Sequence, residues 1–284
     1  MILVGMGCDW MLDRGVNGDD GLAILRTMSF RGTLRWLSIP FVCWVGSCVN
    51  FHPLQPRQTT GKAAEVAALR EPAWQILGSS VAGRPLRVAH YGTGARRVLW
   101  VGGIHGNERE GGVATAMLAA AFVDAGGERA VTLTILEDAN PDGTAAQVRG
   151  NANGIDLNRN FPTKNFKASR LFGQSPLSQP EAKLLHDLIA AQKPHLIVVA
   201  HSCGGDHFIN FDGPAQGVAG RFARLSGYRA RASEDLWPTP GSLGTWAGVE
   251  RGIPILTLEY LRGREPNIAW AETKNAILAV VLDG

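Results

Sequence analysis

The sequence is poor in the features that mark several common classes of protein. Only 19% of its 284 residues are charged and the formal net charge is +3, so a disordered chain, a coiled coil and a dedicated nucleic-acid binder are not expected. The four cysteines lack zinc-finger spacing, and no solenoid-type repeat is present. With 45% apolar residues, the chain has the composition of a globular protein with a core large enough for an enzyme.

The first sixty residues differ in composition from the rest of the chain. After Met28 come two arginines, an apolar run over residues 36–46 and small residues before Cys48. The run has the length of a secretory h-region and is too short to cross a bilayer, which takes about 20 apolar residues. The letters VGSC at 45–48 resemble a bacterial lipobox, in which the cysteine becomes lipidated. We therefore expect residues 1–60 to form a signal or lipoprotein segment and a tether, with export to the periplasm or attachment to a membrane through Cys48.

Acidic residues leave a second interpretation of this segment open. Four aspartates precede Met28, and the n-region of a signal peptide normally lacks them. Under the first interpretation, translation starts at Met28 rather than at Met1. The alternative is a cytoplasmic protein in which this segment is a buried apolar helix or a poorly ordered N-terminal extension.

Residues 61–284 carry the pattern of a catalytic domain. Short apolar or β-branched runs alternate with longer segments of helical composition. Strands separated by helices predict an α/β fold in which a mixed, mostly parallel sheet is sandwiched by helices. The expected strands cover residues 96–103, 131–136, 195–200 and 253–260, and the expected helices cover residues 110–127, 182–192 and 268–282.

Local signals add detail between these elements. Ser178 and Glu181 have the spacing of a capping box, which predicts the start of the helix at 182–192. The letters NPDG at 140–143 have the composition of a turn with a positional role. Residues 140–177 lack periodicity, and so long an irregular segment in a compact domain is typically functional.

Histidine and glutamate residues occur where the predicted strands end. His105 and Glu108 follow the first of these strands, His201 follows the third, and Glu259 lies in the fourth. Active crevices of open α/β sheets lie at the carboxyl ends of strands, so we expect these side chains to meet. Two histidines and one carboxylate suit a catalytic Zn²⁺ with one open position. A single histidine at a strand end is more often structural, so this prediction depends on the motifs around it.

Seven motifs surround those residues. In chain order they are GSSVAGRPLRV at 78–88, GGIHGNERE at 102–110, NPDGT at 140–144, RGNANGIDLNRNFP at 149–162, AHSCGG at 200–205, GSLGTWAG at 241–248 and LTLEY at 256–260. Together and in this order they resemble the zinc carboxypeptidase family M14, and within it the branch of murein peptide amidases. The combination of HGNE with NANGIDLNRNF is highly specific.

The resemblance implies one Zn²⁺ per chain and hydrolysis of a peptide or amide bond next to a free carboxylate. Arginine suits carboxylate binding because its planar fork matches the two oxygens, which lysine does not. The implied roles are zinc ligation by His105, Glu108 and His201, general base catalysis by Glu259, polarisation of the scissile carbonyl by Arg149, binding of the substrate carboxylate by Asn158 and Arg159, and orientation of the first ligand histidine by Asp156.

The substrate implied by the branch is a murein peptide, cut between γ-D-glutamate and diaminopimelate. The zwitterionic side chain of diaminopimelate needs polar partners, which Leu243 in the GSLGTWAG motif does not provide. Digestive members of the family carry a tyrosine that covers the bound peptide, whereas the matching residues 233–244 contain none. Tyr260 neighbours Glu259 on a strand and is therefore expected on the opposite face.

Three other functions remain open at this point. A general metallocarboxypeptidase and a desuccinylase- or aspartoacylase-like deacylase of N-acyl amino acids are both compatible with the motifs. A non-catalytic, peptidoglycan-binding lipoprotein is a different class of function. The presence of Glu259 favours an enzyme, since a protein without activity has no need of the general base.

Overall fold

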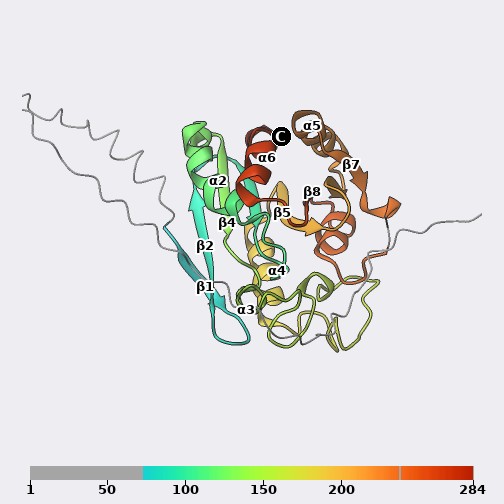
Figure 1. Ribbon diagram of the computed structural model, residues 1–284. Coiled ribbons are helices and arrows are strands. Elements are labelled where there is room, and N and C mark those ends of the chain that lie inside the picture. The colour runs from blue at the N-terminus through green and yellow to red at the C-terminus, as the bar shows by residue number, and fades with distance from the viewer. Residues whose placement is uncertain (1–72, 237, 284) are drawn as a thin grey trace, which may run out of the picture. The chain divides into compact units, whose positions relative to one another are not determined.

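The structure is a computed structural model that describes residues 73–236 and 238–283 (Figure 1). The predicted signal or lipoprotein segment at 1–60, including Met28 and Cys48, lies outside the described residues. So does the beginning of the predicted catalytic domain at 61–284. None of the helices in the described ranges combines the length and the apolar composition that a membrane span requires.

One mixed sheet of eight strands forms the centre of the described domain, in the order β1-β2-β4-β3-β5-β8-β6-β7. Strands β4, β3, β5 and β8 run parallel to one another, and β2 and β6 join them in the antiparallel sense. The strands are β1 (Gln75–Ser79), β2 (Pro85–Tyr91), β3 (Arg96–Val101), β4 (Val131–Leu136), β5 (Leu196–Cys203), β6 (Phe208–Asp212), β7 (Arg229–Ala232) and β8 (Ile255–Leu261). The predicted α/β fold with a mixed sheet is therefore confirmed.

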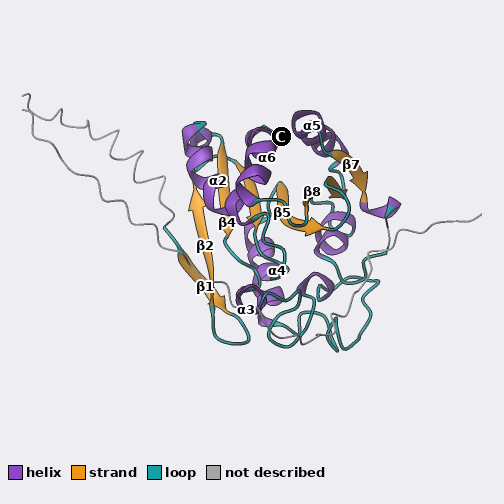
Figure 2. Cartoon of the chain, in the orientation of Figure 1, coloured by secondary structure: helices purple, strands orange, loops and turns teal. Residues whose placement is uncertain are grey.

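Helices cover both faces of this sheet (Figure 2). Alternate residues of β3 point to opposite faces: Trp100 belongs to the core cluster that includes residues of α2, α5 and α6, whereas Leu99 belongs to the cluster that includes residues of α4. Because both sets of strand side chains are buried, the central strands are largely apolar, as is typical of parallel sheets. The helices are α2 (Gly112–Asp124), α3 (Pro141–Ala146), α4 (Pro180–Gln192), α5 (Gln216–Ser226) and α6 (Pro266–Leu282).

Two local predictions were wrong in detail. Helix α4 begins with Gln179 as its N-cap, and no side chain caps it, so Ser178 and Glu181 do not form a capping box. The Glu181 carboxylate instead accepts hydrogen bonds from the Val81 backbone and the Asn151 side chain. The NPDG letters form the start of the short helix α3 rather than a simple turn, with Asn140 as its N-cap.

Four strands were not predicted at all. β1 and β2 form a hairpin from the GSSVAGRPLRV motif, and β6 and β7 extend the opposite edge of the sheet. These strands lie towards the two edges and are short or partly polar, so their sequences lack the long apolar runs of the central strands. The expected strand at 195–200 also extends to Cys203, which places His201 inside β5.

The chain order of the central strands positions the functional residues. Strand β3 pairs with β4 on one side and with β5 on the other, so the chain passes from β3 to β4 and then crosses back past β3 to reach β5. Such a switch point opens a crevice at the carboxyl ends of the two strands. The HGNE motif follows β3 and His201 lies in β5, so both reach this crevice.

Close backbone packing holds the HGNE turn in place, and this generates a stability prediction. A Cβ added at Gly106 would stand 1.9 Å from the Gly143 carbonyl carbon, whereas one added at Gly112 meets nothing within 4 Å. We expect Gly106→Ala to lower the free energy of unfolding by about 1–3 kcal/mol or more, as overpacking does. Gly112→Ala is the control, which the better helix propensity of alanine stabilises by about 0.5–1 kcal/mol. Denaturant unfolding measures the free energy of unfolding of both variants. Equal free energies of unfolding for Gly106→Ala and Gly112→Ala would contradict the close packing at Gly106.

Candidate active site

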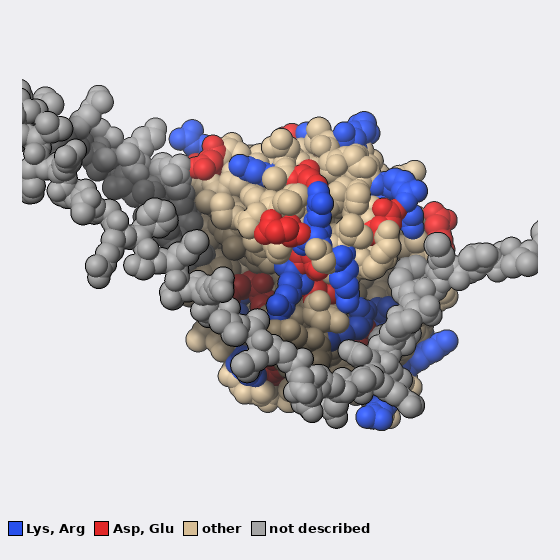
Figure 3. Space-filling view, viewed as in Figure 1, with Lys and Arg blue, Asp and Glu red and all other residues tan. Residues whose placement is uncertain are grey.

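Adjacent parallel strands bring His201 and Glu259 together. The two residues are direct partners in the register of β5 and β8. Val199, two residues before His201, packs with α4 on one face of the sheet, and residues two apart in a strand share a face. His201 and Glu259 therefore project to the α4 side, at the carboxyl ends of their strands. Charged side chains of both signs gather over the middle of the face in Figure 3.

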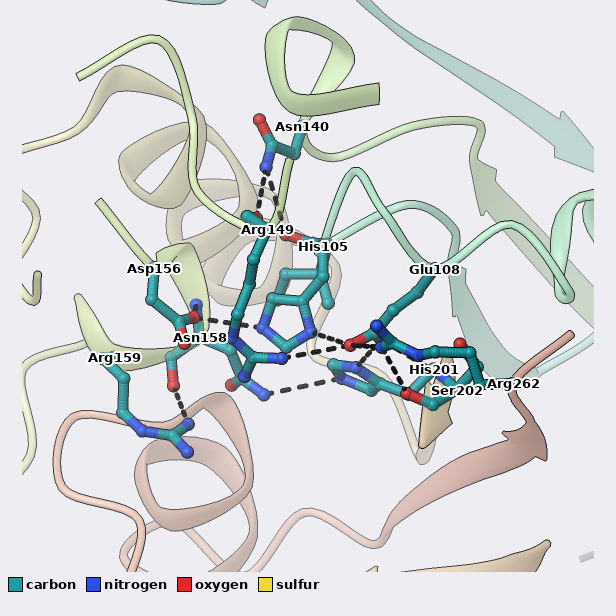
Figure 4. A network of polar contacts seen from close by, with 11 residues as sticks. His105, Glu108, Asn140, Arg149, Asp156, Asn158, Arg159, His201, Ser202 and Arg262 are labelled. Carbon is teal, nitrogen blue, oxygen red and sulfur yellow. Dashed lines mark hydrogen bonds and ion pairs between the residues drawn. The ribbon is translucent and has the colours of Figure 1, made fainter. Parts of the chain in front are cut away.

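The turn after β3 supplies the other two predicted zinc ligands. The backbone N–H of Glu108 donates to the His105 carbonyl at 3.2 Å, which closes the turn. Nδ1 of His105 lies 2.9 Å from Oε1 of Glu108, and Nδ1 of His201 lies 2.8 Å from Oε2 (Figure 4). The three side chains are buried, and their ligand atoms lie within 4.8 Å of one another.

This donor set fits a zinc ion. Zn²⁺ is commonly held by imidazole nitrogens and a carboxylate, with one further position left for water or substrate. Nδ1 of both histidines faces the cluster, while Nε2 of His105 is taken by Asp156 at 3.0 Å. A carboxylate on the outer nitrogen of a ligand histidine fixes its tautomer and raises its basicity. His105, Glu108 and His201 therefore form the candidate zinc site of this chain.

Mutual charge stabilises these buried groups. Burial would raise the pKa of the Glu108 carboxyl, but His105 and His201 outweigh this and hold it well below its usual range. Burial would likewise lower the pKa of His105, but the carboxylates of Glu108 and Asp156 raise it overall. The turn therefore favours a negative Glu108 and positive charge around it, as a cation site requires.

Asp156 connects the metal ligands to the predicted substrate-binding residues. One of its oxygens contacts Nε2 of His105 and accepts a hydrogen bond from the backbone N–H of Asn158 at 2.9 Å. The other oxygen accepts a hydrogen bond from Nε of Arg149 at 2.9 Å. Despite the opposing effect of burial, His105, Arg149 and Arg159 hold the pKa of Asp156 well below its usual range. Asp156 is therefore an anion that positions three neighbours at once.

Three further predicted residues line the same cluster. Nη1 of Arg149 donates to Oε1 of Glu108 at 3.0 Å. Nδ2 of Asn158 lies 3.4 Å from Nε2 of His201, and its Oδ1 accepts the backbone N–H of Leu243 at 2.9 Å. Nη1 of Arg159 donates to the Asn158 carbonyl at 2.7 Å, next to that amide. The structure thus brings the predicted arginines and Asn158 to one side of the zinc ligands.

Glu259 stands beside the cluster as an acid with a shifted pKa. Burial raises the pKa of its carboxyl; His201 lowers it, and the Glu108 charge raises it further. A carboxyl whose pKa is raised is better suited to accept and return a proton near neutral pH. The predicted position of Tyr260 is confirmed, because its ring is fully buried and its hydroxyl lies 3.3 Å from Thr273 of α6, on the opposite face.

Two further residues contribute to the site: Asn140, in the NPDG letters for which the sequence predicted a positional role, and Arg262, which sequence reasoning missed. The Asn140 side chain donates to the Arg149 carbonyl at 3.1 Å, so α3 holds the segment that carries Arg149. Arg262, just after β8, donates through Nη2 to Oε1 of Glu108 at 3.3 Å and to the Ser202 carbonyl at 3.1 Å. The signal for Arg262 was its place three residues after Glu259, at the same end of the sheet.

The geometry predicts how variants separate metal binding from catalysis. Metal analysis of the purified protein is expected to find about one zinc per chain, as a single three-ligand site requires. His105→Ala and His201→Ala each remove a ligand and are expected to lose the metal. Glu259→Gln keeps the shape of a residue outside the donor set and is expected to retain it. Full retention of zinc in both histidine variants would contradict the site.

Sequence comparison places the chain among known proteins. The model of the zinc carboxypeptidase family matches residues 72–219. The chain is 30% identical over 137 residues to murein peptide amidase A of Escherichia coli K12, covering 43% of this chain and 54% of that protein. It is 29% identical over 136 residues to murein peptide amidase A of Vibrio campbellii, covering 42% of this chain and 53% of that protein. The chain thus spans about half the length of the curated relatives that it matches.

Solved structures share the fold. The murein-tripeptide amidase MpaA from Escherichia coli O157 aligns with a TM-score of 0.64 at 24% identity, over 76% of this chain and 96% of that one. The carboxypeptidase A from Helicoverpa armigera aligns with a TM-score of 0.65 at 20% identity, over 76% and 70%. With the family match over more than half of its length and the three zinc ligands in place, the chain belongs to the zinc carboxypeptidase family.

Proposed function

We propose that this protein is a zinc-dependent peptide amidase that cuts the bond between γ-D-glutamate and diaminopimelate in murein peptides. The observation that carries the proposal is the continuous series of contacts from the zinc ligands through Asn158 to Arg159. This series sets a guanidinium group beside the metal site, where the free carboxylate of the leaving residue binds. The names of the curated relatives support the murein substrate.

The chain's own residues divide the reaction between them. Zinc, when bound, polarises the scissile carbonyl and makes a water molecule more acidic. Glu259 takes the proton of the attacking water on its carboxylate and passes it to the leaving nitrogen. Arg149 keeps its positive charge beside the cluster, where it stabilises the negative charge that develops on the carbonyl oxygen.

Arg159 has the features of a carboxylate receptor. The pKa of its guanidinium is lowered, chiefly by burial. The Asp156 carboxylate raises this pKa in part, and the positive charge of Arg149 lowers it further. In the part of the chain that the structure describes, its hydrogen bond goes from Nη1 to the Asn158 carbonyl. The rest of the donor fork is left for a ligand, and a partly desolvated cation gains more from an anion than an exposed one does.

A buried carboxylate supports recognition of the diaminopimelate side chain. Asp212, at the end of β6, is only 7% exposed. A Cβ added at Gly244 would stand 2.2 Å from its Oδ2, so this carboxylate lies directly against the residue after Leu243. Burial raises the pKa of Asp212, which the Ser233 hydroxyl partly offsets. Leu243 offers no polar group, but Asp212 offers one to the ammonium group of the substrate side chain.

The carboxylate anchor predicts a specific pattern of kinetic losses. Arg159→Lys keeps the charge but loses the fork, so kcat/KM for the murein tripeptide is expected to fall about tenfold to a hundredfold, the range of a charge-assisted hydrogen bond. Substrate amidated at its terminal carboxylate is expected to be poor for the wild type and to show little further loss in the variant. This comparison is a double-mutant cycle. Losses that simply add would mean that Arg159 does not bind the carboxylate.

The proposed contact between Asp212 and the ammonium group of the substrate side chain gives a second prediction. Asp212→Asn removes the negative charge that faces the substrate ammonium and is expected to lower kcat/KM for the diaminopimelate substrate about tenfold, the effect of one hydrogen bond to a charged group. The same peptide ending in alanine is expected to be cleaved equally by both enzymes. Asp187→Asn, an exposed carboxylate on α4, is the control. Equal losses on both peptides would assign Asp212 a purely structural role.

We also propose that the protein is exported and anchored through a lipidated Cys48, on the strength of the apolar run and the VGSC letters. A periplasmic or membrane location brings the enzyme to peptides of the cell wall. Expression in a bacterial host with labelled fatty acid is expected to label the wild type in the membrane fraction but not Cys48→Ala. A soluble cytoplasmic protein that retains residues 1–47 by mass spectrometry would contradict the proposal.

A further inference from the structure

A third arginine reaches the zinc ligands from the side away from Arg159. Arg262 follows β8 directly, and its backbone N–H donates to the Cys203 carbonyl at 2.9 Å. The next residue, Gly263, donates its N–H to the buried carboxylate of Glu110 at 2.7 Å. A backbone contact to β5 and a hydrogen bond to the Glu110 side chain thus hold this turn on both sides and fix the position of Arg262.

The Glu108 carboxylate does not require Arg262 as a partner. It already accepts hydrogen bonds from the Ser202 backbone and from Arg149, and it faces both histidines. Arg262 is 43% exposed and uses only Nη2 towards Glu108 and the Ser202 carbonyl. Among the described residues nothing accepts a hydrogen bond from its Nε or Nη1. An exposed guanidinium with free donors is suited to bind an anion from solution.

The two arginines lie on opposite sides of the zinc ligands. Contacts run from Arg159 through Asn158 to His201, and from His201 through Glu108 to Arg262. Figure 4 shows Arg159 and Arg262 at opposite ends of this network, with the zinc ligands between them. A substrate whose leaving residue binds Arg159 and whose scissile carbonyl lies at the metal site extends its acyl part towards Arg262.

We propose that Arg262 is a specificity-determining residue that binds a second carboxylate, on the acyl side of the scissile bond. A γ-linked glutamyl residue carries a free α-carboxylate there, a short aliphatic chain away from the scissile carbonyl. A peptide with ordinary α-linkages has a neutral amide instead. Arg262 therefore selects γ-glutamyl substrates over ordinary peptides. This inference rests on the proposed amidase function and adds the recognition of the acyl half.

The test compares two substrates that differ only in this carboxylate. They are L-alanyl-γ-D-glutamyl-meso-diaminopimelate and the same tripeptide with the glutamyl α-carboxylate converted to a carboxamide. For the wild type, amidation is expected to lower kcat/KM about tenfold to a hundredfold, the range of a charge-assisted hydrogen bond. Arg262→Gln is expected to lose the same factor on the free acid and to be nearly unchanged on the carboxamide. On the free acid, kcat/KM of Arg262→Lys is expected to lie between the values of wild type and Arg262→Gln, because lysine keeps the charge but lacks the planar fork.

Two further measurements separate recognition from support of Glu108. Zinc content is expected to be the same in wild type and Arg262→Gln. Dissociation constants of the two tripeptides, measured by calorimetry in a Glu259→Gln background, are expected to show the same dependence on Arg262 without turnover. Arg264→Gln, two residues on and paired with Glu272 of α6, is the matched control and is expected to behave as wild type.

The outcomes distinguish the possible failures. Equal kcat/KM of wild type on both tripeptides, or equal losses of Arg262→Gln on both, would overturn the role of Arg262 and leave the proposed amidase function standing. Loss of zinc in Arg262→Gln together with equal losses would identify Arg262 as a support for Glu108 alone. Zinc-loaded wild type that cuts neither tripeptide would overturn the proposed function and this inference with it.

Discussion

The site depends on a single buried carboxylate, that of Asp156. Its two oxygens contact a ring nitrogen of His105, the backbone of Asn158 and the guanidinium of Arg149. A buried anion is costly unless it is paired and hydrogen-bonded, and these partners satisfy it. The same contacts orient a candidate zinc ligand, hold Arg149, which is proposed to stabilise the reacting carbonyl, and cap the short 3₁₀ helix Leu157–Arg159 that carries Arg159. Metal binding and substrate binding are thus organised from one point.

The sequence was sufficient for the central fold, and it predicted residues that the structure brings together at one place, for physical reasons. Continuous apolar runs marked β3, β4, β5 and β8, and the motifs fixed His105 and Glu108. Strands towards the edge of the sheet, such as β6 and β7, were missed because their side chains are partly polar and their pairing depends on distant neighbours. The capping box at Ser178 failed because tertiary contacts took Glu181, a competition that local spacing does not reveal.

The contributions of Arg262 and Asp212 were missed for a related reason. Each gains meaning only from a partner far away in the chain: Glu108 for Arg262 and Gly244 for Asp212. Arg159 and Arg262 lie at the two ends of the contact network around the candidate zinc ligands, and Asp212 adds a buried carboxylate against Gly244. Such an arrangement complements a substrate with carboxylates on both sides of the scissile bond and an ammonium group in its leaving residue.

The most direct test of this account is the zinc dissociation constant of Asp156→Asn, measured by chelator competition alongside wild type and Asp187→Asn. Loss of the carboxylate on the outer nitrogen of His105 is expected to weaken zinc binding about tenfold to a hundredfold, as in other metal sites whose ligand histidines lose such a partner. Asp187→Asn is expected to bind zinc as the wild type does. An unchanged zinc dissociation constant in folded Asp156→Asn would contradict the central role of this carboxylate.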